Sequence, residues 1–191
     1  MKKWLKTSMC LLLAIMMIVS STAFVRAEGE GGYITIEPGD SSWDIPLAEL
    51  KVSCGDYEPN GGASEGPANL AVDGNNATMW HTDWEGTSRE NHWFQFEVTG
   101  EYAVNGLRYL PRQTGNSNGT ITKYEVKVSD DGENFTTVAS GSWAADSNWK
   151  IAQFDPQAVK FVRLYSIDAV TDNSWVFASA AELRLAWQPT E

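Results

Sequence analysis

Residues suited to binding a sugar or a metal ion are concentrated between positions 68 and 84, in the stretch ANLAVDGNNATMWHTDW. Its first half, residues 73–78, is a short run of oxygen-bearing side chains interrupted by Gly74. Ca²⁺ takes about 6–8 oxygen ligands from carboxylates, amides, hydroxyls and carbonyls, and such a loop can supply several of them. The same run could instead form an Asx-type turn that holds no ion.

The second half of this stretch, residues 80–84, places two tryptophans around an imidazole and a carboxylate. Aromatic rings pack on the apolar face of a sugar, and the polar groups of His81 and Asp83 can bond its hydroxyls. We therefore expect a sugar-recognition edge here.

Another set of polar groups follows at Tyr109-Leu110-Pro111-Arg112-Gln113, where a strand-like run enters the loop 114–120. The Arg112 guanidinium offers planar, charge-assisted donors to neighbouring hydroxyls, and the Asn118 amide offers one donor and one acceptor group. Arg112 could instead pair with a loop carboxylate, and Asn118-Gly119 could be only a turn. The residues alone leave both interpretations open.

Alternation of apolar and polar residues dominates the chain after the first loops, as in residues 93–98, 124–128 and 161–165. This period of two is typical of strands with one buried face, and turn signals such as Asp131-Gly132 and Asp155-Pro156 separate them. We expect about eight strands in a single antiparallel sandwich or barrel, spanning residues 47–188, with residues 47–54 as its first strand.

The first 27 residues have a basic start, a short apolar run and small residues before Glu28, which predicts a secretory signal peptide. Residues 28–46 are interpreted as a tether or an added edge strand. Removing residues 1–27 takes away four of 14 basic residues and none of 25 acidic ones, which leaves a net charge of −15. This charge argues against nucleic-acid or acidic-lipid partners, and the leader predicts a secreted or extracellular protein.

Four motifs occur in the same order as in a known family: DGNNATMWHTDW, HWFQFEV, GLRYLPRQTGNSNGTITKYEVKVSDDGENF and SAAELRL. Over about residues 50–187 the chain resembles the coagulation-factor type C (discoidin) domains, and more narrowly the family 32 carbohydrate-binding modules. The resemblance implies an antiparallel, jelly-roll-like β-sandwich that binds galactose-type sugars at the loops of one end and holds a structural Ca²⁺.

The resemblance also implies roles for individual residues. Hydrogen bonds to the sugar would come from His81, Arg112 and Asn118, with Glu65 as a possible addition, and aromatic contacts from Trp84, Tyr109 and Trp175. Calcium ligands would be Asp73, Asn76, Thr78 and Glu182, with the backbone carbonyls of Leu70 and Ala181. Glu182 independently favours a metal, because it lies in the apolar run 178–185, where an unpaired buried carboxylate is costly.

Three function classes follow from these residues. We expect a secreted, non-catalytic module for glycans with terminal galactose or N-acetylgalactosamine, with no membrane insertion. An enzyme would depend on a carboxylate pair such as Asp83 and Glu85, because no zinc-protease, serine-hydrolase or phosphate-loop motif occurs in the sequence. The alternative is an adhesion domain that binds a protein or membrane surface through apolar loop tips such as Trp84 and Trp175.

Overall fold

Eight strands of five residues or more form the two layers of the fold in the computed structural model, which describes residues 34–85, 88–171 and 176–189. The expected signal peptide lies outside these residues. The eight strands are β1 (Leu50–Cys54), β4 (Trp93–Val98), β5 (Ala103–Leu110), β6 (Ile121–Ser129), β7 (Thr136–Ser142), β8 (Lys150–Ala158), β9 (Phe161–Ala169) and β11 (Glu182–Trp187). Shorter elements are η1 (Leu47–Glu49), β2 (Glu65–Gly66), η2 (Ala68–Ala71), β3 (Met79–His81), η3 (Arg89–Asn91) and β10 (Ser179–Ala180).

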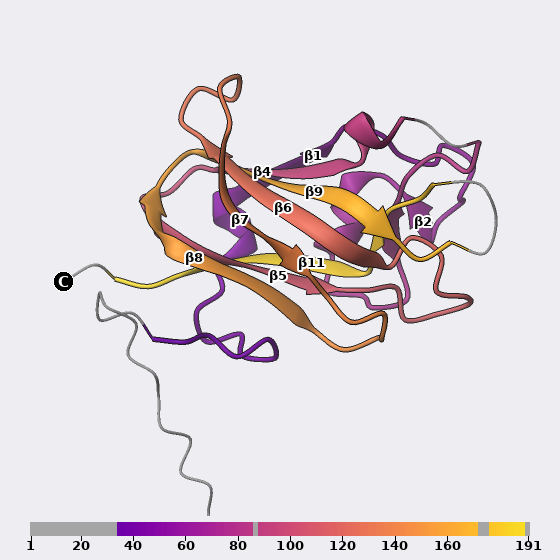
Figure 1. Cartoon of the computed structure of the whole chain (residues 1–191), viewed down its shortest axis with the longest axis horizontal. Helices are drawn as coiled ribbons and strands as arrows, with labels where there is room; N and C mark the ends of the chain where they lie inside the picture. The colour runs from indigo at the N-terminus through magenta and orange to yellow at the C-terminus, as the bar shows by residue number, and fades with distance from the viewer. Residues whose placement is uncertain (1–33, 86–87, 172–175, 190–191) are drawn as a thin grey trace, which may run out of the picture.

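One layer is a five-stranded sheet in the order β1-β4-β9-β6-β7, and the other is a three-stranded sheet in the order β11-β5-β8. All pairs in both sheets are antiparallel. Alternate residues of β4 and β9 are buried, which places Phe94, Phe96, Val162 and Leu164 in the core between the layers. The predicted all-β sandwich is confirmed, and its two layers are visible in Figure 1.

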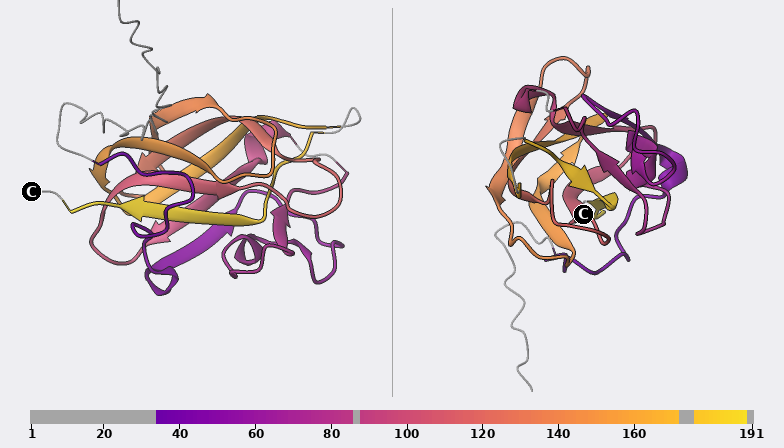
Figure 2. Two further views of the ribbon diagram at one scale, coloured as in Figure 1. Left: turned by 90° about the horizontal axis from the view of Figure 1, so that it is seen from below. Right: turned by 90° about the vertical axis from the view of Figure 1, so that its right-hand side faces the viewer.

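A small third sheet, in the order β10-β3-β2, lies at the end of the sandwich away from the C-terminus (Figures 1 and 2). β10 runs antiparallel to β3, whereas β2 runs parallel to it. Trp80 in β3 is fully buried and meets Phe94 edge to face at 5.6 Å, so the small sheet is anchored in the main core. Among the described residues, no helix is long and apolar enough to cross a membrane.

Residues 34–46 pack on the outer side of the three-stranded sheet, which corrects the expectation of a tether for this part of the chain. Ile36 is buried against Gly106 of β5, and Ile45 is buried in the main core. Arg108 of β5 donates to the carbonyl of Pro38 at 2.9 Å and forms an ion pair with Asp44 at 2.6 Å. The pairing with β11 is limited to a bridge between Asp44 and Ala186, so the segment is a packed covering rather than a full edge strand.

Candidate functional site

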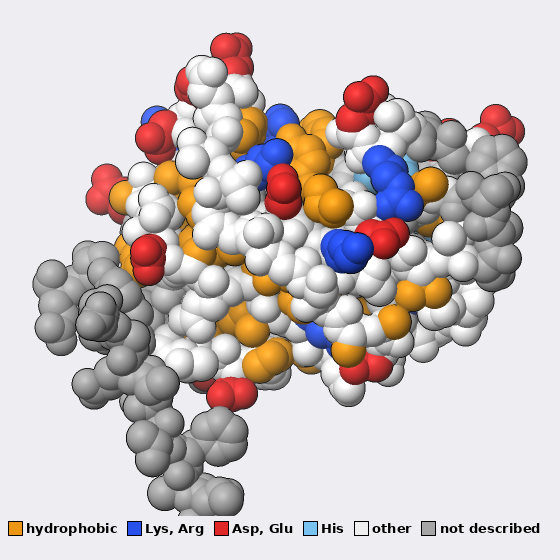
Figure 3. Space-filling view, in the orientation of Figure 1, with side chains coloured by type: hydrophobic (Ala, Val, Ile, Leu, Met, Phe, Trp, Pro, Cys, Tyr) orange, Lys and Arg blue, Asp and Glu red, His pale blue; other side chains and the backbone are white. Residues whose placement is uncertain are grey.

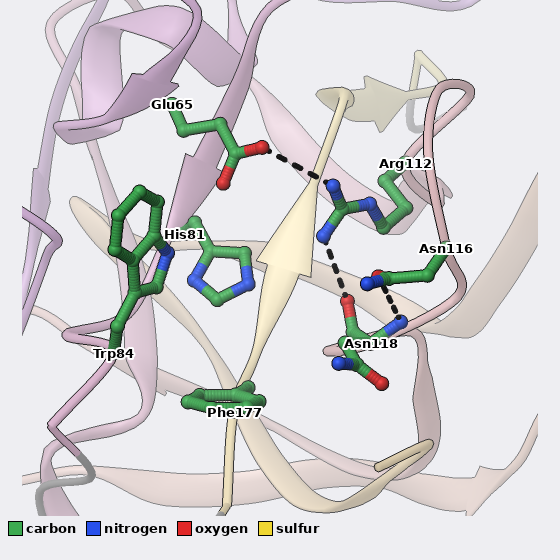
Figure 4. Close-up of a pocket in the computed structure, with 7 residues that line it drawn as sticks. All are labelled: Glu65, His81, Trp84, Arg112, Asn116, Asn118 and Phe177. Carbon is green, nitrogen blue, oxygen red and sulfur yellow. Dashed lines mark hydrogen bonds and ion pairs between the residues drawn. The ribbon is translucent and has the colours of Figure 1, made fainter. Parts of the chain in front are cut away.

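A pocket of about 390 Å³ opens at the end of the sandwich that carries the small sheet. We call it the terminal pocket. It is lined by Glu65, His81, Trp84, Arg112, Asn116, Asn118 and Phe177 (Figure 4). Its volume lies in the range of about 300–1,000 Å³ that is usual for small-molecule sites.

Ser179 joins the strand that carries His81 to the loop that carries Asn118, and these are two sides of the terminal pocket. Across the small sheet Ser179 pairs with His81, and on its other side it forms a parallel bridge with Thr120. The Ser179 N–H donates to the carbonyl of Gly119 at 2.8 Å, and its hydroxyl donates to the carbonyl of Asn118 at 3.2 Å. Gly119 has a φ of 80°, and a Cβ there would lie 2.8 Å from the Ser179 hydroxyl, so this close approach requires glycine.

His81 presents a hydrogen-bond acceptor to the pocket. Its Nδ1 lies 2.7 Å from the carbonyl oxygen of Thr82, which can only accept, so Nδ1 carries the proton and Nε2 has the free lone pair. Burial lowers the pKa of His81 below its usual 6.5, and the nearby Arg112 charge lowers it further, although the bond to Thr82 and the charge of Glu65 oppose these effects. The imidazole is therefore neutral at pH 7.

We expect sugar binding to weaken as the pH falls through the lowered pKa of His81, because protonation of Nε2 removes the acceptor. The unfolded chain takes up this proton first, near pH 6.5, so folding stability also falls below that pH. Calorimetric titrations from about pH 7.5 to about pH 4 would measure the change in affinity.

His81→Gln is the control for this pH dependence, because its amide does not titrate and its weaker binding should not vary with pH. The pKa of His92 is also lowered by burial, so stability alone does not identify His81. Wild-type affinity that stays constant over the whole range would contradict the role assigned to Nε2.

Arg112 follows the end of β5 and is held by three contacts. Its Nε donates to the carbonyl of Thr114 at 3.1 Å, its Nη1 to the carbonyl of Asn118 at 3.4 Å, and its Nη2 to the Glu65 carboxylate at 3.2 Å. The pairing with a carboxylate, one of the two interpretations left open by the sequence, therefore occurs. It does not remove Arg112 from the pocket, because both partners of the ion pair line it.

Asn118 and Asn116 form the side of the pocket that faces Trp84 (Figure 4). The Asn118 N–H donates to Oδ1 of Asn116 at 3.0 Å, which fixes the Asn116 amide beside the Arg112 fork. The turn at Asn118-Gly119 is also present, since Gly119 has a positive φ. The turn and the placement of Asn118 in the pocket are thus compatible.

Two aromatic side chains border the pocket on different sides. Trp84 is 45% exposed, and its backbone N–H donates to the buried carboxylate of Glu58 at 2.9 Å. Glu58 also accepts from the N–H of Asn60 at 2.6 Å, so it joins the loops on which both residues lie. Phe177 is nearly buried and lies 5.4 Å from the His81 ring at an angle of 51°.

The expected role of Tyr109 as an aromatic wall is wrong, because its side chain is fully buried. The residue alternation of β5 directs it into the core, where its ring stacks on Trp143 at 5.1 Å. Its hydroxyl donates to the carbonyl of Ser179 at 3.0 Å and accepts from the N–H of Ile121 at 2.9 Å. Burial raises the pKa of Tyr109, which keeps this hydroxyl protonated as a donor. Tyr109 therefore supports the pocket from beneath without lining it.

The loop proposed to hold calcium gathers oxygens around the hydroxyl of Thr78. This hydroxyl lies 2.7 Å from Oδ2 of Asp73, 2.7 Å from the carbonyl of Asn75 and 3.5 Å from the carbonyl of Leu70. A single hydroxyl proton can serve only one of these acceptors well. The remaining lone pairs are oxygen ligands of the kind that a hard cation takes. The Asx-type turn also forms, because Oδ1 of Asp73 accepts from the N–H of Asn75 at 2.8 Å.

Glu182 is the buried carboxylate beside this loop. It is 1% exposed, its Oε2 forms an ion pair with Arg184, and it has a backbone hydrogen bond at Gly74. Burial raises the pKa of Glu182 and the charge of Asp73 raises it further, whereas Arg184 and the backbone hydrogen bond at Gly74 partly offset these effects. A cation between Asp73 and Glu182 would relieve this unfavourable burial, so the donor set fits calcium.

The positions of Asn76 and Ala181, the other predicted calcium ligands, neither support nor oppose a metal site. Asn76 is exposed in the loop, and Ala181 directly precedes Glu182, with its N–H bonded to the carbonyl of Leu110 at 2.9 Å. No group of three or more His, Cys, Asp or Glu side chains suited to a metal occurs within the described ranges. A cation here would therefore rely on carbonyl and hydroxyl oxygens as well as on the two carboxylates.

Residues 52–183, which include the pocket and the Asp73 loop, match the F5/8 type C domain. The chain belongs to the F5/8 type C domain family. Among curated proteins, this F5/8 type C domain is 41% identical over 120 residues to a galactose oxidase from Gibberella zeae, covering 61% of the chain. It is 35% identical over 133 residues, or 69% of the chain, to an A type blood N-acetyl-alpha-D-galactosamine deacetylase from Flavonifractor plautii. The chain spans 17% of the length of each of these relatives.

Solved structures similar to this F5/8 type C domain include two from Clostridium perfringens. One is a family 32 module in complex with GalNAc-β-1,3-galactose, with a TM-score of 0.65, 33% identity, and coverage of 75% of this chain and 99% of that chain. The other is the family 32 carbohydrate-binding module of NanJ in complex with galactose, with a TM-score of 0.63, 33% identity, and coverage of 75% and 97%.

Sequence reasoning missed three residues that shape the pocket of this F5/8 type C domain. Phe177 lies two positions after Trp175, which is outside the described residues, so the aromatic content of that loop was the available signal. Asn116 lies in the same polar loop as Asn118. Glu58 gave no signal, because only the folded chain places it against the N–H of Trp84. Of the predicted residues, the pocket brings together His81, Trp84, Arg112, Asn118 and Glu65.

Proposed function

We propose that this domain is a non-catalytic carbohydrate-binding module for glycans with a terminal galactose or N-acetylgalactosamine. The observation that carries the proposal is the neutral His81, whose Nε2 acceptor lies in one pocket with the Arg112 fork. A sugar hydroxyl both donates and accepts, so it can donate to Nε2 of His81 and accept from Arg112. The similar family 32 modules in complex with galactose and with GalNAc-β-1,3-galactose support this sugar class.

The aromatic groups support a sugar rather than another polar ligand. Trp84 and Phe177 border the pocket on separate sides of His81 (Figure 4). The axial 4-hydroxyl of galactose leaves a continuous C–H patch on one ring face, and this patch gains dispersion and buried area against an aromatic ring. The open pocket admits one terminal residue, for which we expect a Kd of ~0.1–1 mM.

Preference for galactose over glucose is the test of this proposal. Changing one hydroxyl from axial to equatorial leaves a desolvated group unmatched, at about 1–3 kcal/mol, which corresponds to roughly five- to hundredfold discrimination. The domain would be bound to an immobilised galactose-terminated glycan and eluted with free galactose, N-acetylgalactosamine or glucose. Equal elution by glucose, or retention by none of the sugars while the protein stays folded, would contradict the proposal.

We also propose that the domain holds a structural calcium ion and that it acts outside the cell. Asp73, Thr78 and Glu182, with carbonyl oxygens such as that of Leu70, would hold the ion and join the early loop to β11. Its chemistry would be charge compensation for buried carboxylates. Export is supported by the leader-like residues 1–27 of the sequence.

The adhesion alternative has less support. The large apolar side chains that are exposed among the described residues are Leu47, Tyr57, Trp84 and Ile167. Trp84 lies among polar groups in the terminal pocket rather than alone at an apolar tip. Basic and acidic side chains are interspersed with apolar ones on the face shown in Figure 3. This arrangement favours a polar ligand in the pocket over a membrane surface.

A further inference from the structure

A second hollow adjoins the terminal pocket on the other side of the loop 112–118. We call it the loop groove. It has a volume of about 220 Å³ and lies between the β5–β6 loop, residues 112–120, and the β7–β8 loop at Ala145, Asp146 and Ser147. Arg112 and Asn116 line both hollows, so the two hollows adjoin at these two side chains.

The amide of Asn116 can donate hydrogen bonds to a ligand at the place where the terminal pocket and the loop groove adjoin. Its Oδ1 accepts from the N–H of Asn118 at 3.0 Å, which fixes the direction of the amide. Its Nδ2 donates to no described residue, so two N–H bonds remain for a ligand. A donor at this place can bond a ring oxygen or a hydroxyl of a sugar that spans the two hollows.

Hydrogen bonds hold the two walls of the loop groove together. Nε2 of Gln113 donates to the carbonyl of Pro111 at 2.7 Å and to the carbonyl of Ser147 at 2.9 Å, which joins one loop to the other. Asp146 accepts from the N–H of Asn148 at 2.9 Å and pairs with the buried ammonium of Lys150. The two loops lie side by side in Figure 1. Because these loops are already held in place, less conformational entropy is lost when a ligand binds in the groove.

The charges that line the loop groove indicate which kind of ligand fits it. Its described lining offers hydroxyl, amide and backbone groups without an aromatic ring. The two cations nearby are already compensated, Lys150 by Asp146 and Arg112 by Glu65. An uncompensated anionic group would therefore meet no free positive charge and would lie near the Asp146 carboxylate. This lining fits a neutral, hydroxyl-rich group better than a sulfated or sialylated one.

We propose that the loop groove is a second sugar subsite, which binds the neutral residue next to the terminal galactose-type sugar of the glycan. The inference rests on the proposed function of the terminal pocket. Asn116 would contact the junction of the two sugars, and residues 145–147 would contact the second one. The domain would then distinguish glycans by their penultimate residue as well as by their terminal one.

The test compares one monosaccharide with one disaccharide that carries it. N-acetylgalactosamine and GalNAc-β-1,3-galactose would be titrated into the wild-type protein and into Ala145→Trp, which fills the groove. Ala144→Trp is the matched control, because Ala144 is also exposed but does not line the groove. We expect the wild type and the control to bind the disaccharide about five- to tenfold more tightly than the monosaccharide. We expect Ala145→Trp to lose this gain and to keep its monosaccharide affinity.

Other outcomes separate this inference from the proposed function. Equal affinity for both sugars in the wild type, or a gain that survives in a folded Ala145→Trp variant, overturns the subsite and leaves the terminal pocket standing. Absence of binding to either sugar overturns both. A third ligand, the disaccharide sulfated on its galactose, should lose the gain; tighter binding of the sulfated form would contradict the neutral occupant. Melting curves of each variant confirm that it is folded.

Discussion

Arg112→Ala is expected to abolish measurable binding of galactose while the domain remains folded. The guanidinium is largely buried at the pocket and offers charge-assisted bonds to sugar hydroxyls, each of which contributes about 1.5–3 kcal/mol. Loss of one such bond weakens binding about 10- to 150-fold, and this moves a Kd of ~0.1–1 mM beyond the range of calorimetric titration. Calorimetry with galactose, together with a melting curve, measures both parts of the prediction.

Two further variants make the Arg112 experiment specific. Arg112→Lys retains the positive charge but loses the planar fork, so it should restore little of the affinity. Arg89→Ala removes an exposed arginine that pairs with Asp168 away from the pocket, and it should bind galactose like the wild type. An Arg112→Ala protein that is folded and binds galactose normally would show that Arg112 is only a partner of Glu65.

Removal of calcium is expected to lower the melting temperature while the purified domain stays folded near room temperature. An ion that binds only the native state stabilises it by about 2.7 kcal/mol at a hundredfold excess over its Kd. The physical reason is that buried Glu182 and the nearby Asp73 carry like charges that the cation would compensate. Metal analysis and melting curves with and without chelator provide the measurement.

Glu182→Gln tests which carboxylate is responsible, because the neutral amide removes the buried charge and weakens the metal site together. Its melting temperature should respond little to calcium or chelator. Glu97→Gln is the matched control, since Glu97 is partly exposed and pairs with Lys51 on the five-stranded sheet, and it should respond like the wild type. A wild-type protein that contains no calcium and whose melting curve ignores chelator would refute the metal site.

The sandwich could be predicted because strand alternation is a local property. The period of two in residues 93–98 and 161–165 anticipated β4 and β9, whose apolar residues are buried and paired in register. The covering by residues 34–46 could not be predicted in the same way. It depends on contacts over long sequence separations, such as Asp44 with Arg108 and Ile45 with Leu185. No local pattern encodes such contacts.

For the residues of the site, too, the sequence predicted the properties that are local, and the tertiary structure decided those that depend on distant contacts. The sequence was sufficient to name His81, Arg112 and Asn118 as polar groups on loops next to strands, because their chemistry is a property of the side chains themselves. Only the tertiary structure decided that Tyr109 faces the core and that Phe177 borders the pocket, because those outcomes depend on which sheet face each residue occupies. The convergence itself depends on Ser179, which pairs with His81 and Thr120 together and so joins loops that are distant in sequence.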